Sequence, residues 1–199
     1  MKSFFFKPVL MLAIVCSIAT VACNKNNDNQ SPENQIKQSE SLKIPDYVSL
    51  PANAPAGNSR VATYYAVGVQ KYRAAAKEGD TSAFVWLFVA PKAVLYDISN
   101  QQVGTHYAGP TWKLSTLDSI QAQHFAPAKT APSADGNSID WLLLKPKENV
   151  KQPTGIFTNV IYIQRIATKG GKAPAAAPTK ITDTVDVPYT AVYRFSKKN

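Results

Sequence analysis

The sequence has very few of the residues from which metal centres and thiol-based active sites are built. Its 199 residues include two cysteines and two histidines. Protein metal sites gather several His, Cys or carboxylate ligands, and neither His106 and His124 nor Cys16 and Cys23 have the spacing of a ligand motif. The G-x-S-x-G turn, the G-x-G-x-x-G loop and the P-loop are also absent. We therefore expect no metal, no cofactor and no recognisable catalytic residue.

Long apolar runs are missing after residue 22. The one such run, Val9 to Ala22, has fourteen residues without a charge, whereas a membrane-spanning helix needs about 20 residues. Lys2 and Lys7 precede this run, as in the basic start of a secretory signal peptide. The sequence therefore predicts a signal peptide over residues 1–22 and a protein that leaves the cytoplasm.

The apolar run ends in Thr20-Val21-Ala22-Cys23, small residues before a cysteine that resemble the lipobox of bacterial lipoproteins. The resemblance implies that Cys23 carries a lipid and anchors the protein, on the extracytoplasmic side, to a membrane of the bacterial cell envelope. Thr20 stands where leucine is usual, so cleavage by the ordinary signal peptidase and secretion as a soluble protein stays open. A Cys16–Cys23 disulfide in an uncleaved segment is the remaining alternative.

Residues 23–42 contain almost no apolar side chains and are dominated by Asn, Gln and Ser. Such a segment buries too little surface to offset the entropy lost on ordering. It predicts a disordered polar tether that holds the following domain away from the membrane. A short helix over residues 32–41 is the alternative.

Acidic residues are outnumbered, since 22 Lys and Arg face 13 Asp and Glu and give a formal net charge of +9. The basic residues are scattered along the chain and form no run, helical stripe or nucleic-acid motif. We therefore interpret them as solvated surface and expect no nucleic-acid partner. Attraction to an anionic polymer of the cell surface is the alternative.

Helical periodicity is absent from residues 43–199, which instead contain short β-prone runs separated by turn residues. About nine strands at this spacing predict a single, monomeric all-β domain, an antiparallel sandwich or barrel. Pro91 is expected to separate two of the strands. The expected strands are residues 61–72, 83–89, 93–98, 102–107, 111–114, 119–125, 139–144, 156–166 and 187–195.

The stretch GTHYAGPTW, Gly104 to Trp112, concentrates a histidine, two aromatic residues, two glycines and a proline. Gly109 and Pro110 suit a tight turn, which would place His106 and Trp112 on paired or adjacent strands. Trp112 is then expected to share a core with residues 142–144. On this interpretation His106 holds the turn by a hydrogen bond to a backbone carbonyl.

A ligand site is the second interpretation of the same stretch, because β-sheet modules hold sugars and aromatic ligands on aromatic faces with a few polar groups. A hydrolase-like enzyme that uses His106 with an unidentified partner is the third. Asp140, the one acid expected in a strand, either pairs with Arg165 or Arg194 or simply starts the strand. The sequence thus favours a lipoprotein that binds a small molecule or glycan, or that supports the envelope. The candidate ligand-binding residues are His106, Trp112, Trp141, Arg165, Tyr189 and Tyr193.

Five strings in a fixed order resemble a family of secreted bacterial and fungal proteins of unknown function. The resemblance spans residues 68–195 and implies one secreted β-rich domain without an established activity or substrate. The strings are GVQKY at 68–72, GTHYAGPTW at 104–112, WLLL at 141–144, YIQRIATKGGKAP at 162–174 and VPYTAVYRF at 187–195.

The resemblance also implies features that this chain lacks. Members of the family often carry a cysteine where this chain has Ala74 and another in the position of residues 175–178. Joint loss of both is the expected trace of a dispensable disulfide, so the two places are predicted to be neighbours. Lys113 stands where the family tends to have an acidic residue.

Overall fold

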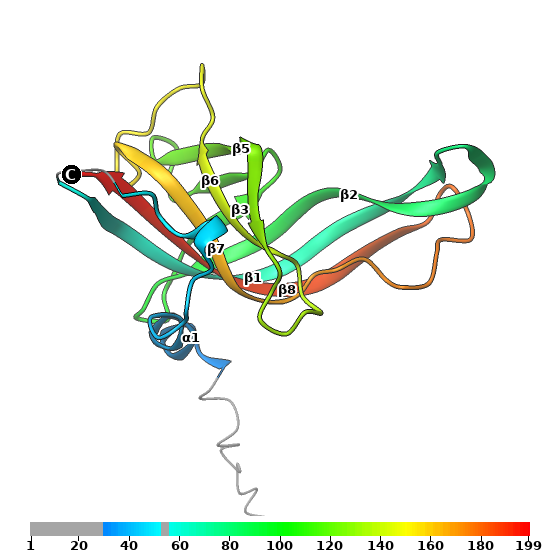
Figure 1. Cartoon of the computed structure of the whole chain (residues 1–199), viewed down its shortest axis with the longest axis horizontal. Coiled ribbons are helices and arrows are strands. Elements are labelled where there is room, and N and C mark those ends of the chain that lie inside the picture. Colours follow the sequence, from blue (N-terminus) through cyan, green and yellow to red (C-terminus); the bar gives the residue numbers. More distant parts are fainter. Residues whose placement is uncertain (1–29, 53–55) are drawn as a thin grey trace, which may run out of the picture.

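The runs of β-branched and aromatic residues form eight strands in the computed structural model, which describes residues 30–52 and 56–199 (Figure 1). The expected signal peptide, the lipid-attachment residue Cys23 and the start of the expected tether lie outside these residues. The elements are α1 (Pro32–Ser39), the short 3₁₀ helix η2 (Asp46–Val48), β1 (Asn58–Lys77), β2 (Asp80–Tyr96), β3 (Gln102–Tyr107), β4 (Thr111–Lys113), β5 (Ser119–Ala131), β6 (Trp141–Pro146), β7 (Val160–Gly170) and β8 (Thr184–Lys198).

The strands follow one another in sequence order and close into an antiparallel barrel, because β8 pairs back onto β1. The prediction of an all-β sandwich or barrel is confirmed. The expected count of about nine falls to eight, because β2 runs through Pro91. From Asp80 to Lys92 this strand has a ladder partner only in β1, and an edge strand tolerates a residue without an N–H.

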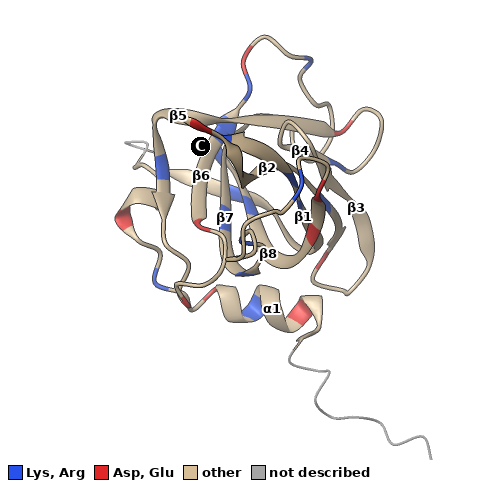
Figure 2. Cartoon of the chain, turned by 90° about the vertical axis from the view of Figure 1, so that its right-hand side faces the viewer, with Lys and Arg blue, Asp and Glu red and all other residues tan. Residues whose placement is uncertain are grey.

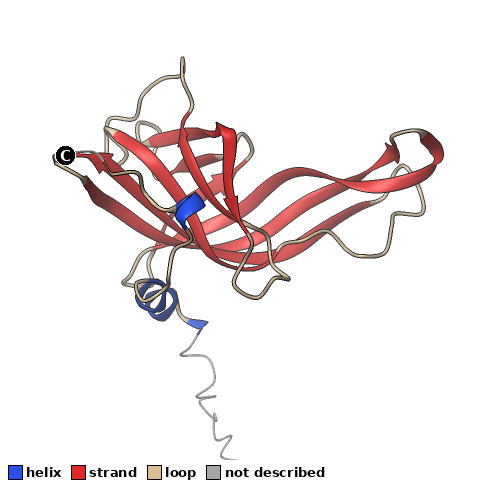
Figure 3. Cartoon of the chain, viewed as in Figure 1, coloured by secondary structure: helices blue, strands red, loops and turns tan. Residues whose placement is uncertain are grey.

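Three strands extend well beyond the barrel and form an arm, defined as residues 69–77 of β1, 80–92 of β2 and 184–188 of β8 (Figures 1 and 3). The arm leaves the barrel just after Gly68, which pairs with Ala93 of β2 and Tyr189 of β8. A Cβ at position 68 would come within 2.1 Å of the Lys92 carbonyl oxygen. Glycine is therefore required here by the close approach of the two backbones.

Side chains alternate across the barrel wall and build two separate cores. The inner core fills the barrel and includes Trp112, Tyr193 and Phe195. The outer core includes Trp141 and Leu143 on the opposite face of the wall. Trp112 shares the inner core with Leu142 and Leu144, as predicted, whereas Leu143 points the other way and belongs to the outer core.

The expectation of a disordered tether over residues 23–42 requires correction. The second half of this segment contains helix α1, which is folded against the barrel (Figure 3). Ser31 caps the helix by accepting a hydrogen bond from the Asn34 N–H, and Ile36 is buried in the outer core. Arg194 of β8 donates from Nη2 to the Ser39 carbonyl oxygen at 2.7 Å and lies 3.2 Å from a Glu40 carboxylate oxygen. The composition of this segment concealed its docking because a single apolar side chain of the helix, Ile36, is buried and the other contacts are polar, made through the Ser39 carbonyl oxygen and the Glu40 carboxylate.

The turn in GTHYAGPTW is formed as expected. Gly109 has φ of +96°, a conformation that favours glycine, and His106 of β3 pairs directly with Trp112 of β4. The prediction that the two residues lie on paired strands is therefore confirmed.

Ala74 and residues 175–178, the two places of the implied disulfide, lie on the same side of the molecule. Ala74 pairs with Trp86 in the arm, and Trp86 donates from its ring nitrogen to the Ala176 carbonyl oxygen at 2.9 Å. The two places are thus linked through one side chain. That their Cα atoms lie within disulfide reach stays a prediction.

Basic residues occupy many elements of the barrel and arm and do not gather in one continuous band (Figure 2). Within residues 30–52 and 56–199, no helix has the length and apolar character needed to cross a membrane.

Candidate functional site

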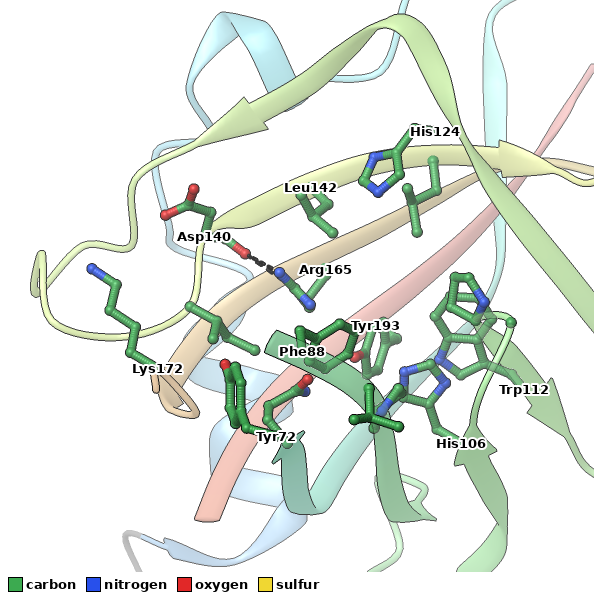
Figure 4. Close-up of a pocket in the computed structure, with 17 residues that line it drawn as sticks. Tyr72, Phe88, His106, Trp112, His124, Asp140, Leu142, Arg165, Lys172 and Tyr193 are labelled. Atoms are coloured by element: carbon green, nitrogen blue, oxygen red, sulfur yellow. Dashed lines mark hydrogen bonds between the residues drawn. The ribbon is translucent and has the colours of Figure 1, made fainter. Parts of the chain in front are cut away.

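A cavity of about 430 Å³ lies where the arm leaves the barrel (Figure 4). Eight-stranded barrels are wide enough to enclose one small ligand, and this volume falls within the range of small-molecule pockets. Residues from the arm, from all strands of the barrel and from the turn after β7 contribute to the wall. The lining consists of Gln70, Tyr72, Phe88, Val89, Pro91, His106, Gly109, Pro110, Trp112, His124, Ile139, Asp140, Leu142, Leu144, Arg165, Lys172 and Tyr193.

His106 is buried in this lining, with 3% of its surface exposed. Its Nδ1 lies 2.9 Å from the Thr111 carbonyl oxygen, which only accepts hydrogen bonds, so Nδ1 carries the proton and Nε2 presents a lone pair. Nε2 makes no hydrogen bond to any residue of the described chain. Burial lowers the pKa of His106 to about 3, partly offset by the bond to Thr111 and reinforced by the nearby Arg165 charge. At neutral pH His106 is therefore an uncharged hydrogen-bond acceptor.

Trp112 forms the adjoining part of the wall. Its ring stacks on that of His106 with centroids 4.4 Å apart, and Tyr193 packs edge-on against it at 5.1 Å. Trp112 is fully buried, yet its ring nitrogen has no hydrogen-bond partner among the described residues. This pair places an acceptor, His106 Nε2, and a buried donor, Trp112 Nε1, on adjoining rings of the cavity lining.

Gln70 and Tyr193 add two further buried polar groups. Gln70 is 2% exposed and Tyr193 is 1% exposed, and the Gln70 amide nitrogen has no hydrogen-bond partner within the described residues. The Tyr193 hydroxyl has the Tyr189 hydroxyl and the Arg165 guanidinium as polar neighbours, but it forms no hydrogen bond of normal geometry with either. Burial raises the pKa of Tyr193, and the Arg165 charge opposes this in part. Buried polar groups are nearly always hydrogen-bonded in proteins, and three of the seven exceptions found in the described residues belong to the lining of this cavity.

Arg165 of β7 brings a positive charge to the cavity. It donates from Nε and Nη2 to the carbonyl oxygen of Asp140, at 3.0 and 2.8 Å. Arg165 thus contacts Asp140 through the main chain, while the Asp140 carboxylate points away (Figure 4). The alternative that the Asp140 acid pairs with an arginine is therefore wrong for the described residues. No carboxylate among the described residues lies within ion-pair distance of the Arg165 guanidinium.

The remaining lining is mostly apolar and aromatic. Tyr72 and Phe88 of the arm pack edge-on with ring centroids 5.7 Å apart, and the Tyr72 hydroxyl donates to the Gly171 carbonyl oxygen. Exposed Lys172 and His124 lie at the rim, and Lys172 donates to the Gly136 carbonyl oxygen at 2.7 Å. An apolar wall that carries a few polar groups is typical of a small-molecule site.

The cavity unites four of the candidate residues, His106, Trp112, Arg165 and Tyr193. Tyr189 is buried in the inner core beside them but does not line the cavity. Trp141 lies outside the cavity because it projects from the opposite face of the wall into the outer core. The side chains of the run WLLL alternate between the two faces of the wall. Because all four residues are apolar, the sequence did not indicate to which face Trp141 projects.

Sequence reasoning missed Gln70, Tyr72, Phe88 and Lys172. Gln70 and Tyr72 belong to the string GVQKY and are two residues apart, so they share one face of β1. That period was a usable signal for two lining residues. Phe88 and Lys172 gave no signal, because only the position of the arm and of the turn after β7 brings them to the cavity.

The chemistry that the lining supports is recognition. Among the described lining residues there is no Ser, Thr or Cys side chain to act as a nucleophile beside His106. His106 is oriented by a backbone carbonyl, whereas hydrolytic triads orient the histidine by a carboxylate. The described residues contain no cluster of three or more potential His, Cys, Asp or Glu metal ligands.

Comparison with known sequences places the chain in a family without assigning an activity. No curated protein and no solved structure matches it. Residues 55–197 match a family described as "Protein of unknown function (DUF3455)". The match covers most of the chain and includes every strand of the barrel except the last residue of β8. The chain therefore belongs to this family of proteins of unknown function, and the matched residues form the barrel and the arm.

Proposed function

We propose that this protein is a small-molecule-binding module of the cell envelope, with the ligand held in the cavity where the arm leaves the barrel. The observation that carries the proposal is an apolar cavity whose lining includes three residues with a buried polar atom that has no hydrogen-bond partner in the described chain, next to the free acceptor of His106. The three atoms are Trp112 Nε1, the Tyr193 hydroxyl and the Gln70 amide nitrogen, and the acceptor is His106 Nε2.

An unpaired buried polar group destabilises a folded protein by about 1–3 kcal/mol. Three such groups on the lining of one cavity are therefore destabilising as long as they have no partner. Their residues border the cavity, so a ligand bound there would lie beside them. The proposal follows from the coincidence of unpaired polar groups and available space.

The hydrolase alternative has less support. A general base works best with a pKa near the working pH, and burial holds the pKa of His106 at about 3. The lining also offers no hydroxyl or thiol nucleophile among the described residues. Binding uses every unusual feature of His106, whereas hydrolysis leaves its backbone partner and depressed pKa without a role.

The membrane anchor is part of the proposal and is supported by sequence. Cys23 follows the small residues of a lipobox-like string, and α1 begins at Pro32, nine positions later. A lipid at Cys23 would therefore hold the barrel close to the membrane surface, because the first contacts with the barrel begin within α1.

A neutral fluorescent probe, phenylnaphthylamine, tests the binding site directly. We expect its emission to rise with the wild-type protein and to saturate at one site. Leu142→Trp, which places an indole into the cavity, is expected to abolish the rise. Leu117→Trp is the matched control, because Leu117 is exposed and lies outside the cavity.

A thermal-shift screen against a small-molecule library complements the probe, because a ligand of the native state raises apparent stability. Absence of any ligand in the screen, together with probe binding that Leu142→Trp does not alter, would contradict the proposed function.

A further inference from the structure

We infer that the ligand of this cavity is an aromatic acid, bound with its anionic group at Arg165 and with a neutral N–H or O–H group at His106. The inference rests on the proposed function and adds the chemical class of the ligand. It depends on the charges at the mouth, on the protonation of the inner wall and on the aromatic lining between them.

The mouth of the cavity is positive. Arg165 gives two of its donors to the Asp140 carbonyl oxygen, and a guanidinium has more donors than these two bonds use. Arg165 points into the space between Leu142 and Tyr193 (Figure 4), and Lys172 lies at the same rim. Among the described lining residues Asp140 is the only acidic one, and its carboxylate points away.

The guanidinium influences groups deep in the cavity. Its charge lowers the pKa values of Tyr193, Tyr72 and His106 relative to burial or hydrogen bonding alone. The charge of Arg165 is therefore felt by groups inside the cavity as well as at its opening. An anion at the mouth would pair with this charge by hydrogen bonds that are stronger than those between neutral groups.

The inner wall selects against a second negative charge. His106 presents the Nε2 lone pair and is neutral at physiological pH, so it repels a carboxylate and accepts from an N–H or O–H. The ring stacked on it carries Trp112 Nε1, a donor without a partner in the described chain. A hydroxyl group both donates and accepts, so it matches this pair, and the ligand is a monoanion with distinct ends.

The space between the two ends is lined by aromatic rings. Tyr72 and Phe88 contribute from the arm, and Trp112 and Tyr193 contribute from the barrel. Aromatic partners favour offset or edge-on contacts with a second ring. A ring system between the acid and the hydroxyl therefore fits the wall better than a flexible aliphatic chain.

A matched pair of probes tests the class of ligand. Anilinonaphthalene sulfonate and phenylnaphthylamine share the same ring system, and only the first has an anionic group. Binding is counted as cavity binding where Leu142→Trp removes it. We expect wild-type protein to prefer the sulfonate by at least about tenfold in Kd, as a charge-assisted hydrogen bond implies.

Arg165→Met is expected to reduce sulfonate binding to the level of the neutral probe and to leave the neutral probe unchanged. Arg165→Lys should retain part of the preference. Arg73→Met is the matched control, because Arg73 is exposed on the arm outside the cavity lining, and it should leave both affinities unchanged. Salt should weaken binding of the sulfonate only.

The outcomes separate the inference from the function on which it rests. Equal cavity binding of the two probes by wild type at low and high salt overturns the acid and leaves the binding function intact, whether or not Arg165→Met folds. Loss of the preference in Arg73→Met as well as in Arg165→Met overturns the role of Arg165. Absence of cavity binding by both probes contradicts the proposed function and the inference together.

Discussion

Arginine side chains on the two faces of the barrel wall have different partners. Arg194 of β8 projects to the outer face, where it meets the Ser39 carbonyl oxygen and the Glu40 carboxylate. Arg165 of the neighbouring strand β7 projects to the inner face and meets a carbonyl oxygen but no described carboxylate. The outer arginine holds α1 on the barrel, while the inner one keeps donors for a ligand.

The two buried tryptophans extend this comparison. Trp141 lies in the outer core under α1 and η2, and Trp112 lies in the inner core and in the cavity wall. Both are almost completely buried, and neither ring nitrogen has a hydrogen-bond partner among the described residues. Burial and a missing hydrogen-bond partner therefore do not identify a site residue by themselves. Trp112 differs because it lines the larger cavity beside His106 and Arg165, whereas Trp141 borders a smaller pocket of about 190 Å³ next to α1.

The largest expected effect is on the tryptophans. Trp112→Ala and Trp141→Ala should each lower the free energy of unfolding by about 3–5 kcal/mol, because each opens a void in a core. Urea denaturation measures both. A conservative change should distinguish the two faces of the wall by their effect on probe affinity. Trp112→Phe should weaken probe binding and Trp141→Phe should not. Equal weakening by both variants would contradict the proposed difference between the inner and outer face.

His106 should make stability depend on pH. Its folded pKa of about 3 lies below the usual value of 6.5, so between these values the unfolded state binds the proton and stability falls as pH falls. The loss should be roughly 1.4 kcal/mol per pH unit from this group. Urea titrations of wild type and His106→Phe between about pH 6 and pH 4.5 measure it, and identical slopes would contradict the depressed pKa.

The two arginines should differ in stability and in binding. Arg194→Met should lower the free energy of unfolding by about 1–3 kcal/mol, because a buried charged donor and its partners on α1 lose their bonds. It should leave probe binding unchanged. Arg165 is partly exposed, so Arg165→Met should lower stability less. Thermal denaturation of the two variants compares them, and the reverse order would contradict the division between the faces.

The smallest effect on the fold is expected at Cys23. Cys23→Ser should leave the stability of the barrel and the affinity for the probes unchanged, because no described contact depends on this residue. It should move the protein from the membrane to the aqueous phase or leave the precursor unprocessed. Detergent partitioning of both forms measures this, and identical aqueous behaviour would contradict the lipid anchor.

The sequence allowed most strands and the central turn to be predicted. The strand over 102–107 and the turn at Gly109 and Pro110 were correct, because alternation and turn chemistry are local properties. Pro91 was wrongly predicted to break a strand. β2 accommodates this proline because, in the described residues, its other edge has no paired strand at this point, and the sequence does not reveal that. The docking of α1 was also missed, because Arg194 supplies its main polar contact from β8, at the far end of the sequence.

The sequence by itself determined the β class, the order of the strands along the chain and the pairing of His106 with Trp112, because period, turn residues and local spacing encode them. Only the tertiary structure decided that β8 closes the barrel on β1 and that Arg165, Gln70 and Phe88 meet at one cavity. It also decided which tryptophan faces inward. These features depend on contacts between strands far apart in the chain and on which side of the wall each side chain projects, and an unbroken apolar run such as WLLL does not specify that side.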